Sequence, residues 1–192
     1  DLGQAPAPQP QTVLLDFDGG TVHIPAWGTF TVRPFDAADI DPIYADDTEL
    51  IKDQIVATVR ENFAGLNVRI LNTDDDPPPD EPYSAVYFGG RSTRAYGVSQ
   101  QVDPYNDDPT DAAIIFVEAF APSQFSHILS PQQMGVAIGN VAAHEIGHLL
   151  GLNHVWNPRD LMDSAGGPDS LWDDQDFMTS PLDPEIFPLG QQ

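Results

Sequence analysis

The apolar positions of this chain follow two patterns, short β-rich runs and longer stretches at helical spacing. Between positions 49 and 63, apolar side chains recur every three or four residues, so they would share one face of a helix. Asp47 and Thr48 supply a capping signal before this stretch, and Gly65 supplies a stop signal after it. We therefore expect an amphipathic helix over 49–63, with a buried face of Leu50, Ile51, Ile55, Val59 and Phe63.

The β-rich runs predict strands on both sides of this helix. The run at 112–120 is apolar almost throughout, with Glu118 inside it, which is typical of a strand buried on both faces. Asp18-Gly19-Gly20 marks a turn, and 74–82 form a stiff acidic loop. The expected strands cover 12–17, 30–33, 67–71, 85–88, 96–99 and 112–120.

A second helical stretch covers 132–150, where Ser130 is the expected N-cap and Pro131 the first-turn proline. A short helix is expected at 172–179, followed by an irregular segment at 181–192. Strands and helices in this order predict an α/β (α+β) fold. The chain shows no internal repeat, so we expect one domain over 12–192, behind a Pro/Ala/Gln-rich tail at 1–11.

The charge of the chain excludes several classes of partner. There are 30 acidic and 7 basic residues, a formal net charge of −23. Phosphate backbones and anionic membrane surfaces would be repelled, so we expect no nucleic-acid partner and no membrane insertion. The charge either steers basic substrates towards the protein or keeps the protein soluble in a saline, extracellular habitat.

Cysteine is absent, so neither a disulfide nor a cysteine-based latency switch operates within this segment. Many secreted bacterial proteases lack disulfides, so this absence does not indicate the cytosol. The chain has no apolar run long enough for a membrane span and no signal peptide at its start. We expect a monomeric, secreted, extracellular protein of bacterial type that was cut from a larger precursor.

The chemically most informative run extends from His144 to His154 and reads H-E-x-x-H-x-x-G-x-x-H. His144 and His148 lie one helical turn apart, so both imidazoles can reach one ion. Gly151 is the expected end of the helix, and the chain reversal there lets His154 supply a third nitrogen. Three protein ligands with one open position are typical of catalytic zinc, and Glu145 is placed to reach a water held there.

This run, followed by Asp160-Leu161-Met162-Asp163, resembles the metzincin clan of zinc endopeptidases and is most similar to its matrixins. The resemblance implies a twisted, mostly parallel five-stranded sheet with an antiparallel edge strand, an active-site helix and a Met-turn. It also implies an N-terminal subdomain over about 12–151 and a small C-terminal subdomain over about 152–192. Met162 is then the apolar floor beneath the three imidazoles.

The resemblance also bears on the substrate cleft. The position at which astacins and serralysins carry a tyrosine near the metal is Ser164 here, so we expect no tyrosine ligand. The segment after the Met-turn should line the pocket for the residue that follows the scissile bond. The sequence does not fix which strand is the edge that pairs with the substrate; 94–100 or a nearby segment is the candidate. The expected pocket residues are Ser164, Gly166, Gly167 and Trp172.

Further metal sites are expected to be few. Matrix metalloproteinases carry a second, structural zinc, but His23 and His127 alone are too few for it, so we expect it to be absent. Aspartate-rich loops suit calcium, although none has the full EF-hand spacing, and a solvated acidic surface is the alternative. The candidate calcium ligands are Asp16, Asp18, Asp74, Asp76, Asp103 and Asp107.

The leading hypothesis is a secreted zinc endopeptidase that cuts extended protein, with Glu145 as the general base for metal-activated water. One alternative is a glycoprotein-directed peptidase of narrow specificity, whose neighbouring domains choose the target. Another is a pseudoenzyme, a metal-stabilised adhesion or binding module. Glu145 argues against the pseudoenzyme, because a structural zinc needs no base beside an open position.

Overall fold

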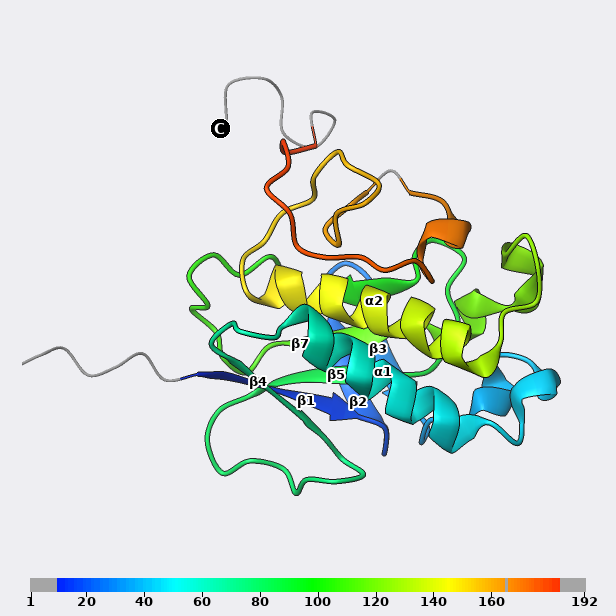
Figure 1. The fold of residues 1–192 in the computed structure, drawn as a ribbon. Coiled ribbons are helices and arrows are strands. Elements are labelled where there is room, and N and C mark those ends of the chain that lie inside the picture. The colour runs from blue at the N-terminus through cyan, green and yellow to red at the C-terminus, as the bar shows by residue number, and fades with distance from the viewer. Residues whose placement is uncertain (1–9, 165, 184–192) are drawn as a thin grey trace, which may run out of the picture.

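A five-stranded sheet with the strand order β4-β1-β5-β7-β6 forms the centre of the fold (Figure 1). The computed structural model describes residues 10–164 and 166–183. Neighbouring strands pair in parallel except at one edge, where β6 runs antiparallel to β7. This confirms the predicted mostly parallel sheet with an antiparallel edge strand. The strands are β1 (Gln11–Asp16), β4 (Val68–Asn72), β5 (Ser84–Phe88), β6 (Gly97–Ser99) and β7 (Ala112–Ile115).

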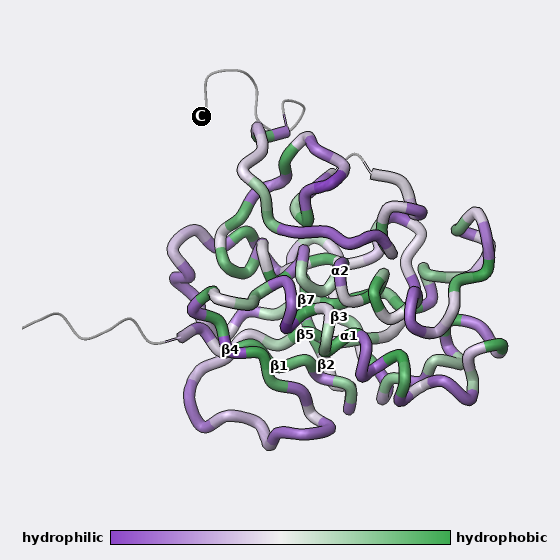
Figure 2. Tube along the Cα trace, viewed as in Figure 1, coloured by the Kyte–Doolittle hydropathy of each residue, from purple (hydrophilic) through white to green (hydrophobic). Residues whose placement is uncertain are grey.

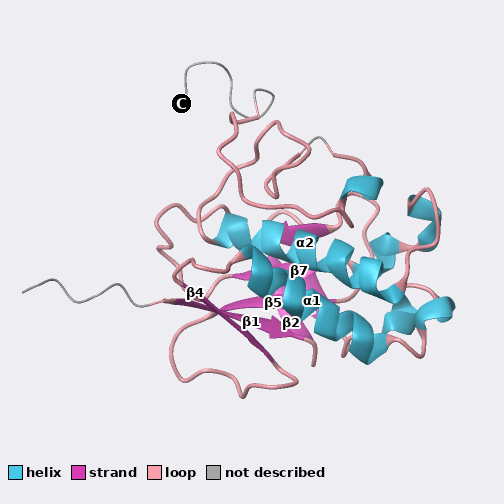
Figure 3. Cartoon of the chain, viewed as in Figure 1, coloured by secondary structure: helices cyan, strands magenta, loops and turns pink. Residues whose placement is uncertain are grey.

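Two helices, α1 (Thr48–Asn62) and α2 (Pro131–Leu149), lie side by side across one face of this sheet (Figures 1 and 3). Glycines on α2 let the helices approach closely. A Cβ added to Gly135 would stand 2.5 Å from the Cβ of Gln54, and one added to Gly139 would stand 2.7 Å from the Cβ of Thr58. Helix α2 is therefore held firmly against α1.

The buried face of α1 agrees with the predicted one except at its start. Ile51, Ile55 and Val59 are fully buried, but Leu50 is 40% exposed. Leu50 precedes Ile51 directly, so its side chain points about 100° away from the buried stripe. The predicted cap is also not used as expected, because Asp47 makes no side-chain capping hydrogen bond.

The opposite face of the sheet is covered by a hairpin of β2 (Gly20–Ile24) and β3 (Gly28–Val32). The side chains of β7 alternate between the two faces: Ala113 and Ile115 join the helix-side core, whereas Ala112 and Ile114 pack with the hairpin. The sequence predicted only the second strand of this hairpin. Hydrophobic residues concentrate where these layers meet, while the connecting loops are largely hydrophilic (Figure 2).

Two predicted elements are wrong. The strand expected at 112–120 ends at Ile115, and a 3₁₀ helix (Val117–Phe120) follows, because the chain turns after Phe116, where the Ala119 amide donates to the Phe116 carbonyl at 2.9 Å. The helix expected at 172–179 does not form. Its backbone instead pairs with the segment before Met162, where the Leu161 amide donates to the Asp176 carbonyl at 2.9 Å.

The ends of the predicted domain lie partly outside the described residues. Of the tail expected at 1–11, residues 1–9 are not described, and Gln11 already belongs to β1. The irregular segment expected at 181–192 is described only to Asp183. Among the helices of the described residues, none is long and apolar enough to cross a membrane.

Candidate active site

Helix α2 carries two of the three histidines and is fixed at both ends. At its start, Ser130 and Gln133 form a capping box: the Ser130 hydroxyl accepts from the Gln133 amide at 3.2 Å, and the Gln133 side chain accepts from the Ser130 amide at 3.0 Å. At its end, Gly151 adopts a φ of 90° and donates to the His148 carbonyl at 2.9 Å. The predicted stop at Gly151 is thus confirmed in the structure.

The reversal after Gly151 brings His154 back to the two helical imidazoles. Its Nε2 atom lies 3.0 Å from Nε2 of His144 and 3.1 Å from Nε2 of His148. Among the residues that the structure describes, this triad is the cluster of at least three ligand-type side chains that could hold a metal ion. The predicted ligand set therefore converges on one point.

Backbone carbonyls orient the two helical rings. Nδ1 of His144 lies 2.7 Å from the Leu161 carbonyl, and Nδ1 of His148 lies 2.8 Å from the Leu152 carbonyl. A carbonyl can only accept, so we assign the proton of each ring to Nδ1, which leaves the Nε2 lone pairs facing His154. Three imidazole nitrogens so close together cannot all find a hydrogen-bond donor in one another. They fit a cation, and three imidazoles suit zinc.

Burial keeps the imidazoles in their metal-binding neutral form. Desolvation lowers the pKa of His144 to about 3 and that of His148 to about 4, with neighbouring imidazoles adding to the effect. Burial also lowers the pKa of His154, whereas the carboxylates of Asp183 and Asp163 raise it. Neutral imidazoles need not release a proton before they bind a metal.

Glu145 of α2 lies next to these rings, and its side chain points towards the edge strand β6. It is only 6% exposed, and a Cβ on Gly97 would stand 2.8 Å from its Cγ. Burial raises the pKa of the Glu145 carboxyl to about 8, whereas hydrogen bonds from the Ser99 amide and hydroxyl lower it. A cation at the histidines would lower it further, because a nearby opposite charge favours the ionised form.

The turn at Met162 connects the third histidine to the helix. Asp160 accepts a hydrogen bond from the Met162 amide at 3.0 Å, and the Met162 carbonyl accepts from the Val155 amide at 3.0 Å. Met162 is 3% exposed and packs against Gly147 of α2. This turn therefore fixes both the ring of His144, through Leu161, and the chain beside His154.

A cleft of about 660 Å³ opens over the triad and Glu145. The edge strand β6 and the segment after Met162 both line it. Three predicted pocket residues, Ser164, Gly166 and Gly167, belong to this lining. The fourth, Trp172, does not: its ring packs edge-on against His127 at 5.4 Å.

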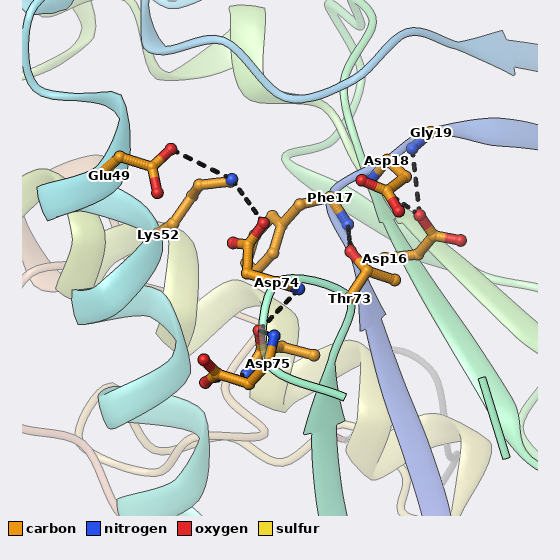
Figure 4. A network of polar contacts seen from close by, with 10 residues as sticks. Asp16, Phe17, Asp18, Gly19, Glu49, Lys52, Thr73, Asp74 and Asp75 are labelled. Carbon is orange, nitrogen blue, oxygen red and sulfur yellow. Dashed lines mark hydrogen bonds and ion pairs between the residues drawn. The ribbon is translucent and has the colours of Figure 1, made fainter. Parts of the chain in front are cut away.

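The six aspartates proposed for calcium lie in three separate loops, and the carboxylates of Asp16, Asp74, Asp76 and Asp103 have partners within the protein. Figure 4 shows two of these loops, where Asp16 accepts from the amides of Asp18 and Gly19 and Asp74 pairs with Lys52 at 2.8 Å. Asp76 lies 3.9 Å from Arg60. In the third loop, Asp103 accepts from the Asp108 amide at 2.8 Å, while Asp107 is exposed. Calcium binding stays a prediction.

Several residues of the site were not identified from the sequence. Ser99 reaches Glu145 from another element, and no local pattern in the sequence marks it. Asp160 did have a signal, because an aspartate two residues before a turn amide is a common Asx-turn position. Asn140 also escaped notice; its side chain donates to the Leu171 carbonyl at 3.0 Å and so anchors a segment that lines the cleft.

The chain resembles known proteins in family and, more distantly, in structure. The family model Matrixin matches residues 29–169. A solved zinc-dependent peptidase from Methanocorpusculum labreanum is 14% identical over 88% of this chain and 96% of its own chain, with a TM-score of 0.46. The GM1-bound ECX AB5 holotoxin is 14% identical over 75% of this chain and 53% of that chain, with a TM-score of 0.32. No curated protein matches the sequence.

Proposed function

Since the chain belongs to the matrixin family of zinc metallopeptidases, we propose that it is a secreted endopeptidase in which Glu145 is the general base. The observation that carries this proposal is the position of Glu145 beside three converging imidazoles, within one cleft. A structural zinc site needs neither a neighbouring carboxylate nor an open cleft. Both features favour hydrolysis over a purely structural role for the metal.

The residues of the chain divide the chemistry between them. The three histidines would hold a zinc ion, which supplies Lewis acidity and makes water acidic enough to ionise near pH 7. The Glu145 carboxylate accepts the proton of the attacking water and returns it to the leaving nitrogen. Ser99 of β6 lies beside this carboxylate, and its amide and hydroxyl favour the ionised form that acts as the base.

An extended polypeptide is the substrate that fits the edge of the sheet. The strand β6 pairs with β7 on one side only and lines the cleft with its other side. An extended segment can therefore add to β6 through backbone hydrogen bonds, which need no particular side chains. This supports cleavage of unfolded or extended protein rather than of a small amide.

The proposal extends to the state and location of the protein, to Met162 and to calcium. We infer a monomer that is secreted and belongs to a larger precursor, and the excess of 23 negative charges suits an extracellular, saline setting. The Met162 side chain is proposed as the apolar floor of the metal site. Calcium is proposed as an additional ion that the aspartate-rich loops bind.

The direct test is to incubate the zinc-loaded protein with unfolded casein and map the products by mass spectrometry. Internal cuts that stop when the metal is chelated and return with added zinc support an endopeptidase. Release of terminal residues alone would contradict the endopeptidase proposal. Tight binding of casein without any cut would favour a binding module.

A further inference from the structure

Arg94 and Trp27 form a stacked pair at one end of the cleft. The guanidinium carbon of Arg94 lies 4.2 Å from the centre of the Trp27 ring, and both residues line the cleft. Arg94 precedes the edge strand β6, while Trp27 belongs to the β2–β3 hairpin on the other face of the sheet. Neither residue takes part in the site around the histidines.

The position of Trp27 is fixed by the hairpin and by the core beneath it. Ala26 adopts a φ of 62° in the turn, and the Trp27 amide donates to the Ile24 carbonyl at 3.1 Å. The indole stacks on Phe116, with ring centres 6.0 Å apart and an angle of 27° between the planes. Phe116 is fully buried, so Trp27 rests on a rigid support.

The backbone of Arg94 is held as well. The Ser92 hydroxyl accepts from the amide of Arg94 at 3.0 Å and from that of Ala95 at 3.2 Å. With its backbone in this turn and its guanidinium on Trp27, Arg94 has lost much of its conformational freedom before any ligand binds. A preorganised side chain loses less entropy on binding than a free one.

Arg94 has no acidic partner of its own among the described residues. Four of the seven basic residues form ion pairs, namely Arg33, Lys52, Arg60 and Arg69. Of the other three, only Arg94 lines the cleft. The chain has 30 acidic residues, yet none of the carboxylates that the structure describes forms an ion pair with Arg94. The five N–H donors of its guanidinium suit a carboxylate.

The contacts along α2 show which end of the cleft Arg94 occupies. Gly97 lies next to Glu145 of α2. The chain after β6 then reaches the end of α2, where the Asp103 amide donates to the His148 carbonyl at 2.9 Å. Arg94 therefore lies towards the start of α2. Leu171, which is bound to Asn140 one turn before His144, lies towards the same end. Arg94 and the wall after the Met-turn thus share the end expected to hold residues beyond the scissile bond.

The other charged side chains of the cleft are acidic, so they would repel a substrate carboxylate. Glu145, Asp160 and Asp163 line the part of the cleft around the histidines. A substrate carboxylate next to the metal site would face these three acidic side chains. Among the described residues that line the cleft, Arg94 is the one lysine or arginine that an acidic substrate group can meet.

We propose that Arg94, stacked on Trp27, is a carboxylate-binding subsite that selects an acidic group on the substrate after the scissile bond. The inference rests on the proposed peptidase function. Arg94 precedes Gly97 by three residues, so the recognised group lies roughly two to three residues after the bond that is cut. The carboxylate comes from a glutamate or aspartate side chain, or from the C-terminus of the substrate.

The test compares peptides that differ only by Glu or Gln at each of the first four positions after the scissile bond. All peptides carry an amidated C-terminus, and one further set has a free C-terminus. At one position, the wild type is expected to cleave the Glu peptide about 3- to 10-fold more efficiently in kcat/KM, the range of a partly exposed ion pair. A preference seen only with the free C-terminus identifies the terminal carboxylate as the bound group.

Variants assign the preference to one side chain. Arg94→Gln is expected to bring the Glu-to-Gln ratio close to one, and Arg94→Glu to reverse it in favour of a Lys peptide. Arg91→Gln is the matched control, because Arg91 is exposed, nearby in sequence and outside the cleft lining. A ratio near one in the wild type at every position, or an unchanged ratio in Arg94→Gln, would overturn the subsite.

Binding to zinc-loaded Glu145→Ala separates this inference from the peptidase function. The affinities of fluorescently labelled Glu and Gln peptides can be compared without turnover. If no peptide is cleaved but Glu peptides still bind more tightly through Arg94, the subsite stands and the peptidase function fails. If peptides are cleaved and neither kcat/KM nor affinity distinguishes Glu from Gln, the function stands and the subsite fails.

Discussion

The sulfur of Met162 lies 2.5 Å from the point at which a Cβ on Gly147 would stand. The turn at Met162 can therefore press against α2 only because residue 147 has no side chain. The same turn places the Leu161 carbonyl on His144 and bonds the chain next to His154. The packing of one glycine thus helps to align ligands from two separate segments.

Gly147→Ala should disturb both the fold and the metal site. The added methyl group overpacks the contact, and we expect a loss of about 1–3 kcal/mol in the free energy of unfolding. Zinc affinity should fall in the same variant, because Met162 and Leu161 must move. Urea unfolding and zinc titration measure the two effects. Gly167→Ala is the control for stability, since a Cβ there would meet no atom within 4 Å; equal stability of both variants would contradict the packing argument.

Loss of the third ligand should be distinguishable from loss of a surface histidine. His154→Ala removes the nitrogen that lies about equally close to both helical imidazoles, at 3.0 and 3.1 Å. Its zinc affinity should fall by more than the roughly 10- to 100-fold typical when only a partner that orients a ligand is lost. His23→Ala, at an exposed hairpin position, should bind zinc as the wild type does. Competition with a chelator of known affinity gives both values, and unaltered affinity in His154→Ala would exclude it as a ligand.

Gly97→Ala should impair turnover with little effect on zinc binding. The new methyl group would stand 2.8 Å from Cγ and 2.9 Å from Oε1 of Glu145, so the carboxylate must shift from its position beside β6. We expect kcat to fall by about 10- to 100-fold, because displacement of a positioned base by about 1 Å is costly. Zinc content and the unfolding midpoint should stay close to those of the wild type. Full activity in this variant would show that β6 does not position Glu145.

The stability of the fold should fall with rising pH through the titration of Asp111. Burial raises the pKa of this carboxyl to about 6, although the Ser84 hydroxyl donates to it at 2.6 Å. The folded state therefore holds the proton more tightly than the unfolded chain. The resulting stabilisation is complete below about pH 4, the usual pKa of aspartate, and is lost as the pH rises through about 6.

Asp111→Asn tests this dependence, because an amide cannot titrate in this range. Urea unfolding between pH 4 and pH 7 should show a decrease in stability for the wild type and a smaller decrease for the variant. Asp108→Asn serves as a comparison: hydrogen bonds from Thr110 lower the pKa of Asp108, so its contribution has the opposite sign. Identical pH profiles of Asp111→Asn and the wild type would contradict the assignment.

The sequence was sufficient to predict α2 and the histidine triad, because both depend on local spacing. A helix places residues four apart on one face, and a glycine in the left-handed region ends it. The capping box at Ser130 and the stop at Gly151 are local signals of the same kind. The order of strands and helices predicts an α/β (α+β) fold, whereas the mostly parallel five-stranded sheet was implied by the resemblance to the metzincins.

The remaining features depend on contacts between distant segments. Ser99 reaches Glu145, and Trp27 reaches Arg94, only after β6 and the β2–β3 hairpin have packed on the sheet. The expected helix at 172–179 failed for the same reason, since the chain there bonds with the segment around Leu161 instead of with itself. No local pattern reports such pairings.

Comparison of the zinc-loaded wild type with zinc-loaded Glu145→Gln tests the central claim most directly. The substituted amide would keep the shape of the side chain but could not accept the proton of the attacking water. With equal zinc content confirmed for both, cleavage of unfolded casein should fall by at least about 10²- to 10⁴-fold, the usual contribution of a general base. If Glu145→Gln cleaves as fast as the wild type, Glu145 is not the base and the proposed mechanism is wrong.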